Sequence, residues 1–164
     1  MARAVDDPRY PHEAGACPLS RWSGRSDRCR WCDEPAAAGF AWCSNPCEDG
    51  YRRNHWWDVA RHAALARHDR RCVRCRLGPD TLLEARWLLR ALVPMGPVAA
   101  AHLWQSAEWA ALGQACAVEV HHRVPLLGAG YGAGCHHHLD GLETLCHRHH
   151  VAVTLLQARQ PRSA

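Results

Sequence analysis

The chain of 164 residues contains no lysine, so all 20 of its lysine-plus-arginine positions are arginine. It also has no apolar signal segment at its N-terminus and no apolar run long enough to span a membrane. These absences predict a cytoplasmic protein with no membrane partner. The net charge is only +4, but an arginine head is planar and carries several donors. The arginine bias is also what GC-rich coding would produce, but its physical consequence is a head group well suited to contact phosphate.

Cysteine, in contrast, is abundant, with 10 residues. In a reducing cytoplasm such cysteines more often bind metal than form disulfides. One compact set has the spacing of a zinc knuckle pair and consists of Cys29, Cys32, Cys43 and Cys47. This set predicts a structural zinc in a separate N-terminal finger over residues 29–50, preceded by an irregular segment over residues 1–28.

A second pair, Cys72 and Cys75, lacks a nearby partner pair. Cys146 and His149 are the obvious partners further along the chain. Together they would form a Cys₃His zinc site, which Zn²⁺ accepts as readily as Cys₄. The sequence thus predicts two structural zinc ions.

Three cysteines remain, and three adjacent histidines follow one of them. Such cysteines usually serve as small, buried, apolar side chains. Cys135, beside the histidines, could instead be a metal ligand. The three histidines are compatible with a role as metal ligands, with contacts to phosphate, or with a loop that has no binding role. The residues left open in this way are Cys17, Cys116, Cys135, His136, His137 and His138.

Hydrophobic spacing predicts a connecting helix within residues 51–71, from Tyr51 to Asp69, and two further helices over residues 82–92 and 98–112. The last two lie in an insert over about residues 80–113. Three tryptophans of this insert fit either base stacking or a core at helical spacing, and the core is the favoured interpretation. They are Trp87, Trp104 and Trp109.

The histidine-rich C-terminal part predicts a strand around residues 118–124, a second short strand at 142–145 and a helix over 146–157. Because side chains alternate along a strand, His121 and His122 should point to opposite sides. On the helix, His147 and His150 are i, i+3 neighbours. The expected order is strand, loop, strand, helix.

Two motifs carry a family resemblance: Glu119-Val120-His121-His122-Arg123-Val124-Pro125-Leu126 and Leu142-Glu143-Thr144-Leu145-Cys146-His147-Arg148-His149-His150. They resemble the zinc-knuckle branch of the HNH, or ββα-metal, endonucleases. Trp42-Cys43-Ser44-x-x-Cys47 resembles the treble-clef-like fingers found beside HNH domains. The resemblance implies a small zinc-stabilised α+β protein, with a ββα-metal nuclease core and its helical insert over residues 72–158 and a tail over 159–164.

The resemblance also implies roles. His122 matches the general base that activates water, and His150 matches the metal-binding histidine. His121, where many members carry Asp, would join His150 in holding Mg²⁺ or another divalent ion. Arg123 and Arg148 are the expected phosphate contacts.

The expected function is therefore a metal-dependent endonuclease that hydrolyses phosphodiester bonds in DNA. Gly141 stands where the family has Asn, His149 replaces the second cysteine of the usual pair, and Val153 replaces a common lysine. These departures keep two alternatives open. One is a catalytically decayed, zinc-dependent nucleic-acid-binding module, and the other is a structural or protein-interaction module.

Overall fold

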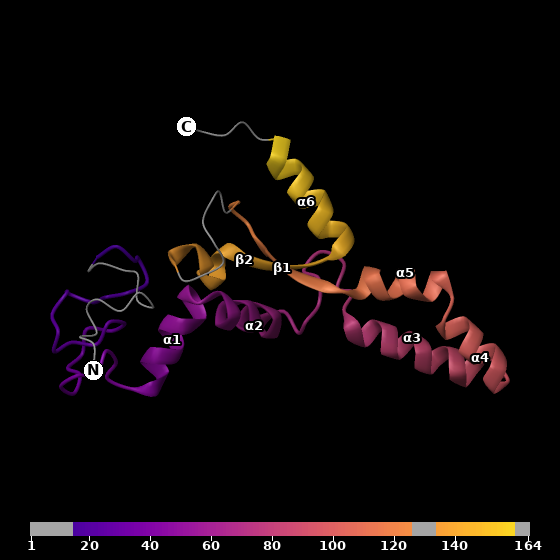
Figure 1. The fold of residues 1–164 in the computed structure, drawn as a ribbon, viewed down its shortest axis with the longest axis horizontal. Coiled ribbons are helices and arrows are strands. Elements are labelled where there is room, and N and C mark those ends of the chain that lie inside the picture. The colour runs from indigo at the N-terminus through magenta and orange to yellow at the C-terminus, as the bar shows by residue number, and fades with distance from the viewer. Residues whose placement is uncertain (1–14, 126–133, 160–164) are drawn as a thin grey trace. The chain divides into compact units, whose positions relative to one another are not determined.

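A computed structural model describes residues 15–125 and 134–159. The described residues form six α-helices and one two-stranded sheet (Figure 1). The elements are α1 (Asn45–His55), α2 (Trp57–Arg67), α3 (Pro79–Leu92), α4 (Pro97–Trp104), α5 (Ala107–Cys116), β1 (Val118–His122), the 3₁₀ turns η1 (Cys135–His137) and η2 (Leu139–Gly141), β2 (Leu142–Cys146) and α6 (His147–Arg159).

The chain divides into two compact units. The first comprises Met1–Ala63 and Leu126–Leu142, and the second comprises Ala64–Pro125 and Glu143–Ala164. Most of the chain between β1 and β2 thus belongs to the first unit. Among the helices of the described residues, none combines the length and apolar character needed to cross a membrane.

Turns rather than regular elements build the start of the first unit. The Cys29 amide donates to the Glu34 carbonyl at 2.8 Å, and Asp33 closes this turn with a φ of 64°. Helix α1 follows, with a proline in its first turn, where a missing N–H costs nothing. Its inward residues are Tyr51 and His55, and the Tyr51 ring packs against Trp42 with centroids 4.7 Å apart.

The single connecting helix expected from Tyr51 to Asp69 is instead interrupted at Trp56. This residue has extended backbone angles, φ −103° and ψ 121°, and separates α1 from α2. The Arg52 guanidinium lies over the Trp56 ring, 4.5 Å from its centroid, and His55 is fully buried at the end of α1. Helical periodicity could not reveal this break, because no proline or glycine marks it.

In the second unit, the strand–strand–helix order is the one predicted. β1 pairs with β2, and α6 begins directly after β2. The segment before α3 is tied to β2 twice: the Val73 amide donates to the Thr144 carbonyl at 2.9 Å, and the Thr144 hydroxyl donates to the Arg71 carbonyl at 2.7 Å. The buried cluster consists of Cys72, Leu145, Cys146 and Val153.

The helical insert contains three helices where the sequence predicted two. The helix expected over residues 98–112 is split, because Ser106 caps a new helix by accepting from the Trp109 amide at 3.2 Å. The core interpretation was wrong for Trp87, which is 68% exposed. Helix α3 instead turns Leu82 toward Gly113 of α5. Trp104 and Trp109 pack on each other with centroids 4.5 Å apart.

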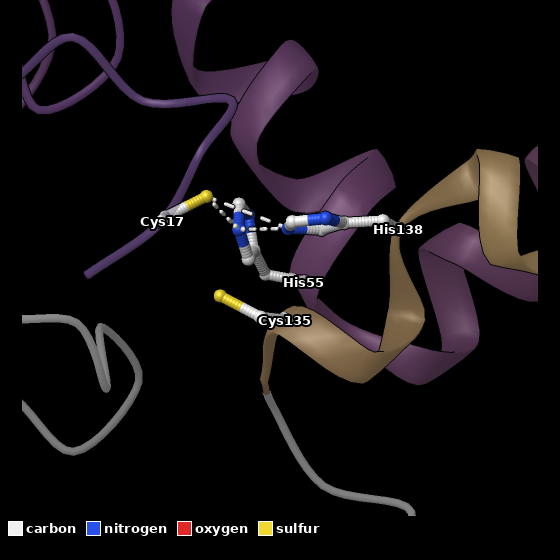
Figure 2. Close-up of side chains that lie close together, drawn as sticks. All are labelled: Cys17, His55, Cys135 and His138. Carbon is white, nitrogen blue, oxygen red and sulfur yellow. Dashed lines mark hydrogen bonds between the residues drawn. The ribbon is translucent and has the colours of Figure 1, made fainter. Parts of the chain in front are cut away.

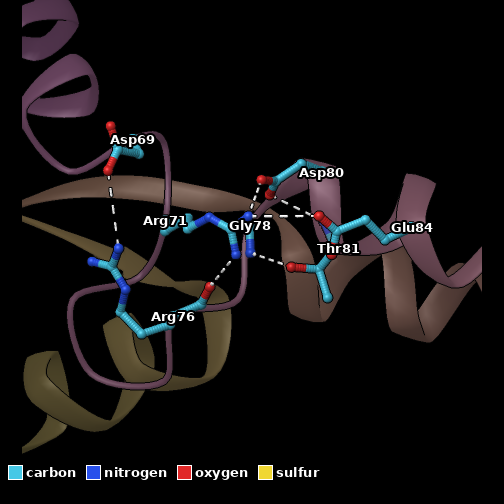
Figure 3. A network of polar contacts seen from close by, with 7 residues as sticks. All are labelled: Asp69, Arg71, Arg76, Gly78, Asp80, Thr81 and Glu84. Carbon is cyan, nitrogen blue, oxygen red and sulfur yellow. Dashed lines mark hydrogen bonds and ion pairs between the residues drawn. The ribbon is translucent and has the colours of Figure 1, made fainter.

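A polar network holds the turn that leads into α3 (Figure 3). Arg71 pairs with Asp80 and lies 3.9 Å from Glu84, and it donates to the Arg76 carbonyl at 3.3 Å. The Gly78 amide donates to the Thr81 hydroxyl at 3.2 Å. The backbone at Gly78 therefore passes close to the Arg71 side chain.

Gly78→Ala should lower the free energy of unfolding, because a Cβ there would lie 2.7 Å from the Arg70 carbonyl oxygen and 3.0 Å from the Arg71 Cγ. The expected cost of such overpacking is about 1–3 kcal/mol. Gly96→Ala is the matched control, since Gly96 also caps a helix that begins with proline and nothing lies within 4 Å of its Cβ position. Urea denaturation of both variants measures the difference, and equal midpoints would contradict this packing.

Candidate functional site

The first predicted cysteine set is brought together around one point. Cys29, Cys32, Cys43 and Cys47 place their Sγ atoms within 4.8 Å of one another. The Sγ–Sγ distances are 3.5 Å for Cys32–Cys43, 3.5 Å for Cys43–Cys47 and 3.6 Å for Cys47–Cys32. Zn–S bonds in a tetrahedron separate two sulfurs by about 3.8 Å. The set therefore has the size of a Cys₄ zinc site.

The second predicted set also converges. Cys75 Sγ lies 3.8 Å from Cys146 Sγ, and the Nδ1 atom of His149 lies 3.4 Å from Cys72 Sγ and 3.2 Å from Cys146 Sγ. All four ligand atoms lie within 4.8 Å of one another. The arrangement fits a Cys₃His zinc site. It would hold the first turn of α6 against the knuckle that begins at Cys72.

Backbone amides favour the metal-binding form of one cysteine in each set. Burial alone would raise the pKa of the Cys72 thiol, but amide hydrogen bonds from Cys146, Cys75 and Arg74 lower it to about 6. The pKa of Cys29 is lowered to about 7 in the same way, against the effect of burial, by the amides of Cys32 and Cys43. The thiolate is the ligand, so this lowering favours metal binding at one cysteine of each set, whereas burial raises the pKa of Cys32 to about 12 and that of Cys75 to about 11.

The structure contains a third Cys/His group that the sequence analysis did not assemble. Cys17, His55, Cys135 and His138 place their ligand atoms within 4.8 Å of one another (Figure 2). The sequence alone assigns no ligand role to Cys17, and it leaves Cys135 and the histidine run open between several roles. The spacing Cys135-x-x-His138 is that of a half knuckle and was the available signal. Nothing in the sequence marked His55, which lies within a helical pattern.

Cys116 is the one remaining cysteine of the described residues outside these groups. It is buried at the end of α5. Burial raises the pKa of its thiol. It therefore behaves as the small buried apolar side chain that was predicted.

The histidines implied by the HNH resemblance lie in the second unit. The rings of His121 on β1 and His150 on α6 have centroids 5.0 Å apart at an interplanar angle of 80°. His121 is 7% exposed, and its buried Nε2 has no hydrogen-bond partner among the described residues. Burial, with a smaller contribution from His150, lowers the pKa of His121. A neutral imidazole with an unused nitrogen is what a metal ligand requires.

A carboxylate organises the helix side of this pair. Glu119 accepts a hydrogen bond from the Nδ1 atom of His147 at 3.0 Å, and its second carboxylate oxygen lies 3.2 Å from the Nδ1 atom of His150. A proton on Nδ1 that faces this carboxylate would leave the lone pair on the Nε2 atom of His150. This arrangement of carboxylate, imidazole and open nitrogen is common behind metal-binding histidines.

Helix α6 also fixes the end of β1. The Gln157 side-chain amide donates to the carbonyls of His122 and Arg123, at 3.2 and 3.0 Å. His122 is buried, whereas Arg123 and Arg148 are exposed. Contact of these two arginines with a nucleic acid stays a prediction.

The structure also describes two other positions of the HNH pattern, Thr154 and Gly141. Thr154 donates its hydroxyl to the His150 carbonyl at 2.9 Å and so braces the first turns of α6. Gly141 ends η2, and nothing lies within 4 Å of its Cβ position. A Cβ atom would therefore fit there. Leu126 lies outside the described residues.

No family model, curated protein or solved structure matches this chain. The resemblance to HNH endonucleases thus stands on its motifs and on the element order. What the structure supports directly is a small mixed α/β protein whose described residues include three Cys/His groups that could hold zinc. This exceeds by one the two zinc sites that the sequence predicted.

Cys75→Ser should remove one zinc ion per chain and lower the free energy of unfolding by at least about 3 kcal/mol, because zinc binding and folding are linked. Cys116→Ser is the control for the ion count, since it also removes a cysteine but Cys116 belongs to none of the three groups. Native mass spectrometry counts the ions and urea denaturation gives the stability. An unchanged zinc count in Cys75→Ser would rule out the Cys₃His site.

Proposed function

We propose that this protein is a zinc-stabilised, metal-dependent endonuclease of the HNH type that hydrolyses phosphodiester bonds in DNA. The observation that carries the proposal is the pairing of His121 with His150. Their rings are neighbours, and the Nε2 atom of His121 is buried without a hydrogen-bond partner among the described residues. Leaving such a nitrogen unsatisfied is costly unless something binds it.

The donor set suits a divalent ion with open coordination positions. Two imidazoles leave room for water and for a phosphate oxygen, unlike the closed four-ligand cysteine groups. Such an ion supplies Lewis-acid stabilisation of the charge that develops on the phosphate and on the leaving 3′-oxygen. His121 and His150 would hold it, and Glu119 would fix the tautomer and orientation of His150.

His122 is the proposed general base, which takes a proton from the attacking water. Its backbone is held by the Gln157 side chain at the end of β1, so the position of the imidazole is restricted at its root. The exposed Arg123 and Arg148 side chains would contact the phosphate. Arginine suits this role because its planar head donates to two oxygens at once.

Gly141 favours a second candidate, a nucleic-acid-binding module without turnover. The family places Asn there, and glycine has no side chain to orient a base or brace the loop. That candidate predicts salt-sensitive binding to DNA and no cleavage with any divalent ion. A purely structural or protein-interaction module would instead show no phosphate-dependent binding.

Zinc-loaded protein should nick supercoiled plasmid when Mg²⁺, Mn²⁺ or Ni²⁺ is added. His122→Ala should reduce the cleavage rate by about 10²–10⁴-fold, the usual contribution of a general base, without changing the zinc content. His102→Ala is the control, because His102 is exposed on α4 in the same unit. Gel assays with a metal series give the rates.

The outcomes separate the candidates. Cleavage by His122→Ala at the parent rate would reject its role as base. No cleavage by the parent protein, together with salt-sensitive DNA binding and an intact zinc content, would select the binding module. In that event Gly141→Asn is the informative variant, since nothing lies within 4 Å of the Cβ position and the change restores the residue type of the family.

Glu119→Gln should raise the divalent-ion concentration needed for half-maximal cleavage by about 10–100-fold, because loss of a carboxylate behind a metal-binding histidine typically weakens metal affinity by that factor. Glu108→Gln, in the first turn of α5, is the control. Titration of Mn²⁺ at a fixed DNA concentration measures the shift. A lower maximal rate at an unchanged half-saturation point would argue against a positioning role.

A further inference from the structure

We propose that Cys17, His55, Cys135 and His138 bind a third resident zinc ion in a closed tetrahedral Cys₂His₂ site. The four side chains come from three separate stretches of the first unit and point at one centre (Figure 2). The proposal is independent of nuclease activity. It concerns how this unit is held together.

The distances match a tetrahedron around zinc. Cys17 Sγ lies 3.2 Å from the Nε2 atom of His55 and 3.4 Å from that of His138, and the two Nε2 atoms are 3.2 Å apart. Zn–S and Zn–N bonds of ordinary length separate sulfur from nitrogen by about 3.6 Å and two nitrogens by about 3.3 Å. The group thus has the size of the two cysteine-rich sites.

The tautomer of His55 is fixed in the form that binds metal. Its Nδ1 atom lies 2.7 Å from the Tyr51 carbonyl oxygen, which can only accept a hydrogen bond. Nδ1 therefore carries the proton, and Nε2 presents a lone pair to Cys17 and His138. The Sγ atom of Cys17 and the Nε2 atoms of His55 and His138 form a triangle. One proton can be shared by only two of these atoms at a time, whereas one cation at the centre can bind all three.

The surroundings hold the ligands before any ion binds. His55 is fully buried and Cys17 is 2% exposed, and the His55 ring stacks on Tyr51 with centroids 4.2 Å apart. On the other side of the group, the Gly134 amide donates to the His55 carbonyl at 2.8 Å, and the Leu139 amide donates to the Asn54 side chain at 3.1 Å. These bonds fix both ends of the Cys135–His138 turn on α1.

Ligand type and closure identify the ion and its role. Two thiolates and two imidazoles in a tetrahedron suit zinc, and four protein ligands leave no position for a substrate. The ion would join Cys17 to His138 across 121 positions of the chain. Cross-links that close long loops restrict the unfolded chain most. The third zinc is therefore structural, and it anchors the segment that precedes β2.

The zinc content of the full-length protein is the first test. The parent should hold three ions per chain by native mass spectrometry, and His138→Ala should hold one fewer than the parent. His136→Ala is the matched control, because it removes a neighbouring histidine outside the three groups and should leave the count unchanged. Two ions in the parent, or an equal count in the parent and His138→Ala, would overturn the proposal.

Cobalt substitution tests the ligands themselves and does not depend on the folding of His138→Ala. Cys135→His should keep the third ion, because it exchanges one ligand type for another. It should also shift the visible d–d bands of the Co²⁺-loaded protein and weaken the sulfur-to-cobalt charge-transfer band. A cobalt spectrum identical to that of the parent would overturn the assignment of Cys135. Neither readout requires DNA cleavage, so the failure of one proposal is distinguishable from that of the other.

Discussion

Coordination of cysteine and histidine side chains around shared centres is the constraint on which the rest of this structure depends. In the second unit, the buried cluster of Cys72, Leu145, Cys146 and Val153 is half cysteine, and both cysteines belong to the Cys₃His group. Large apolar side chains such as Trp87 and Leu155 remain exposed. With so little apolar core, the free energy of metal binding to these groups would contribute directly to the free energy of folding. Without an ion, each group would leave four thiol or imidazole side chains crowded together.

The Cys₃His group also explains how the proposed nuclease site is positioned. His149 belongs to this group and the next residue is His150, so an ion bound by His149 would fix the turn of α6 that presents His150. Glu119 and His121 come from β1, and β1 pairs with the strand that ends at Cys146. The closed site thus orders a short sheet and one helix, and these present an open pair of histidines. The two kinds of site differ in coordination. A metal site with four protein ligands is closed and stabilises the fold, whereas a site with fewer protein ligands has an open position that can bind a reactant.

Much of this arrangement could be predicted from the sequence, because knuckle spacing and side-chain alternation are local signals. The spacing Cys72-x-x-Cys75 predicts half of a zinc site. The pattern of valines and histidines between Val118 and His150 predicts β1, β2 and α6. The third Cys/His group could not be predicted, because its ligands are far apart in the sequence. In addition, the sequence around His55 does not distinguish it from any other polar residue of a helix. The break at Trp56 and the exposure of Trp87 depend on tertiary packing, which periodicity does not encode. The nuclease chemistry itself rests on motif resemblance and on the geometry of His121, His150 and Glu119.

The most direct test of the central claim is removal of zinc from the parent protein with a strong chelator, followed by circular dichroism. The account predicts that helical signal and near-ultraviolet tryptophan signal are lost together as zinc leaves. Added Zn²⁺ should restore both signals, and Mg²⁺ should restore neither, because thiolate sites select zinc. A metal-free protein that keeps its secondary structure and its tryptophan environment would contradict the claim that these Cys/His groups hold the fold together.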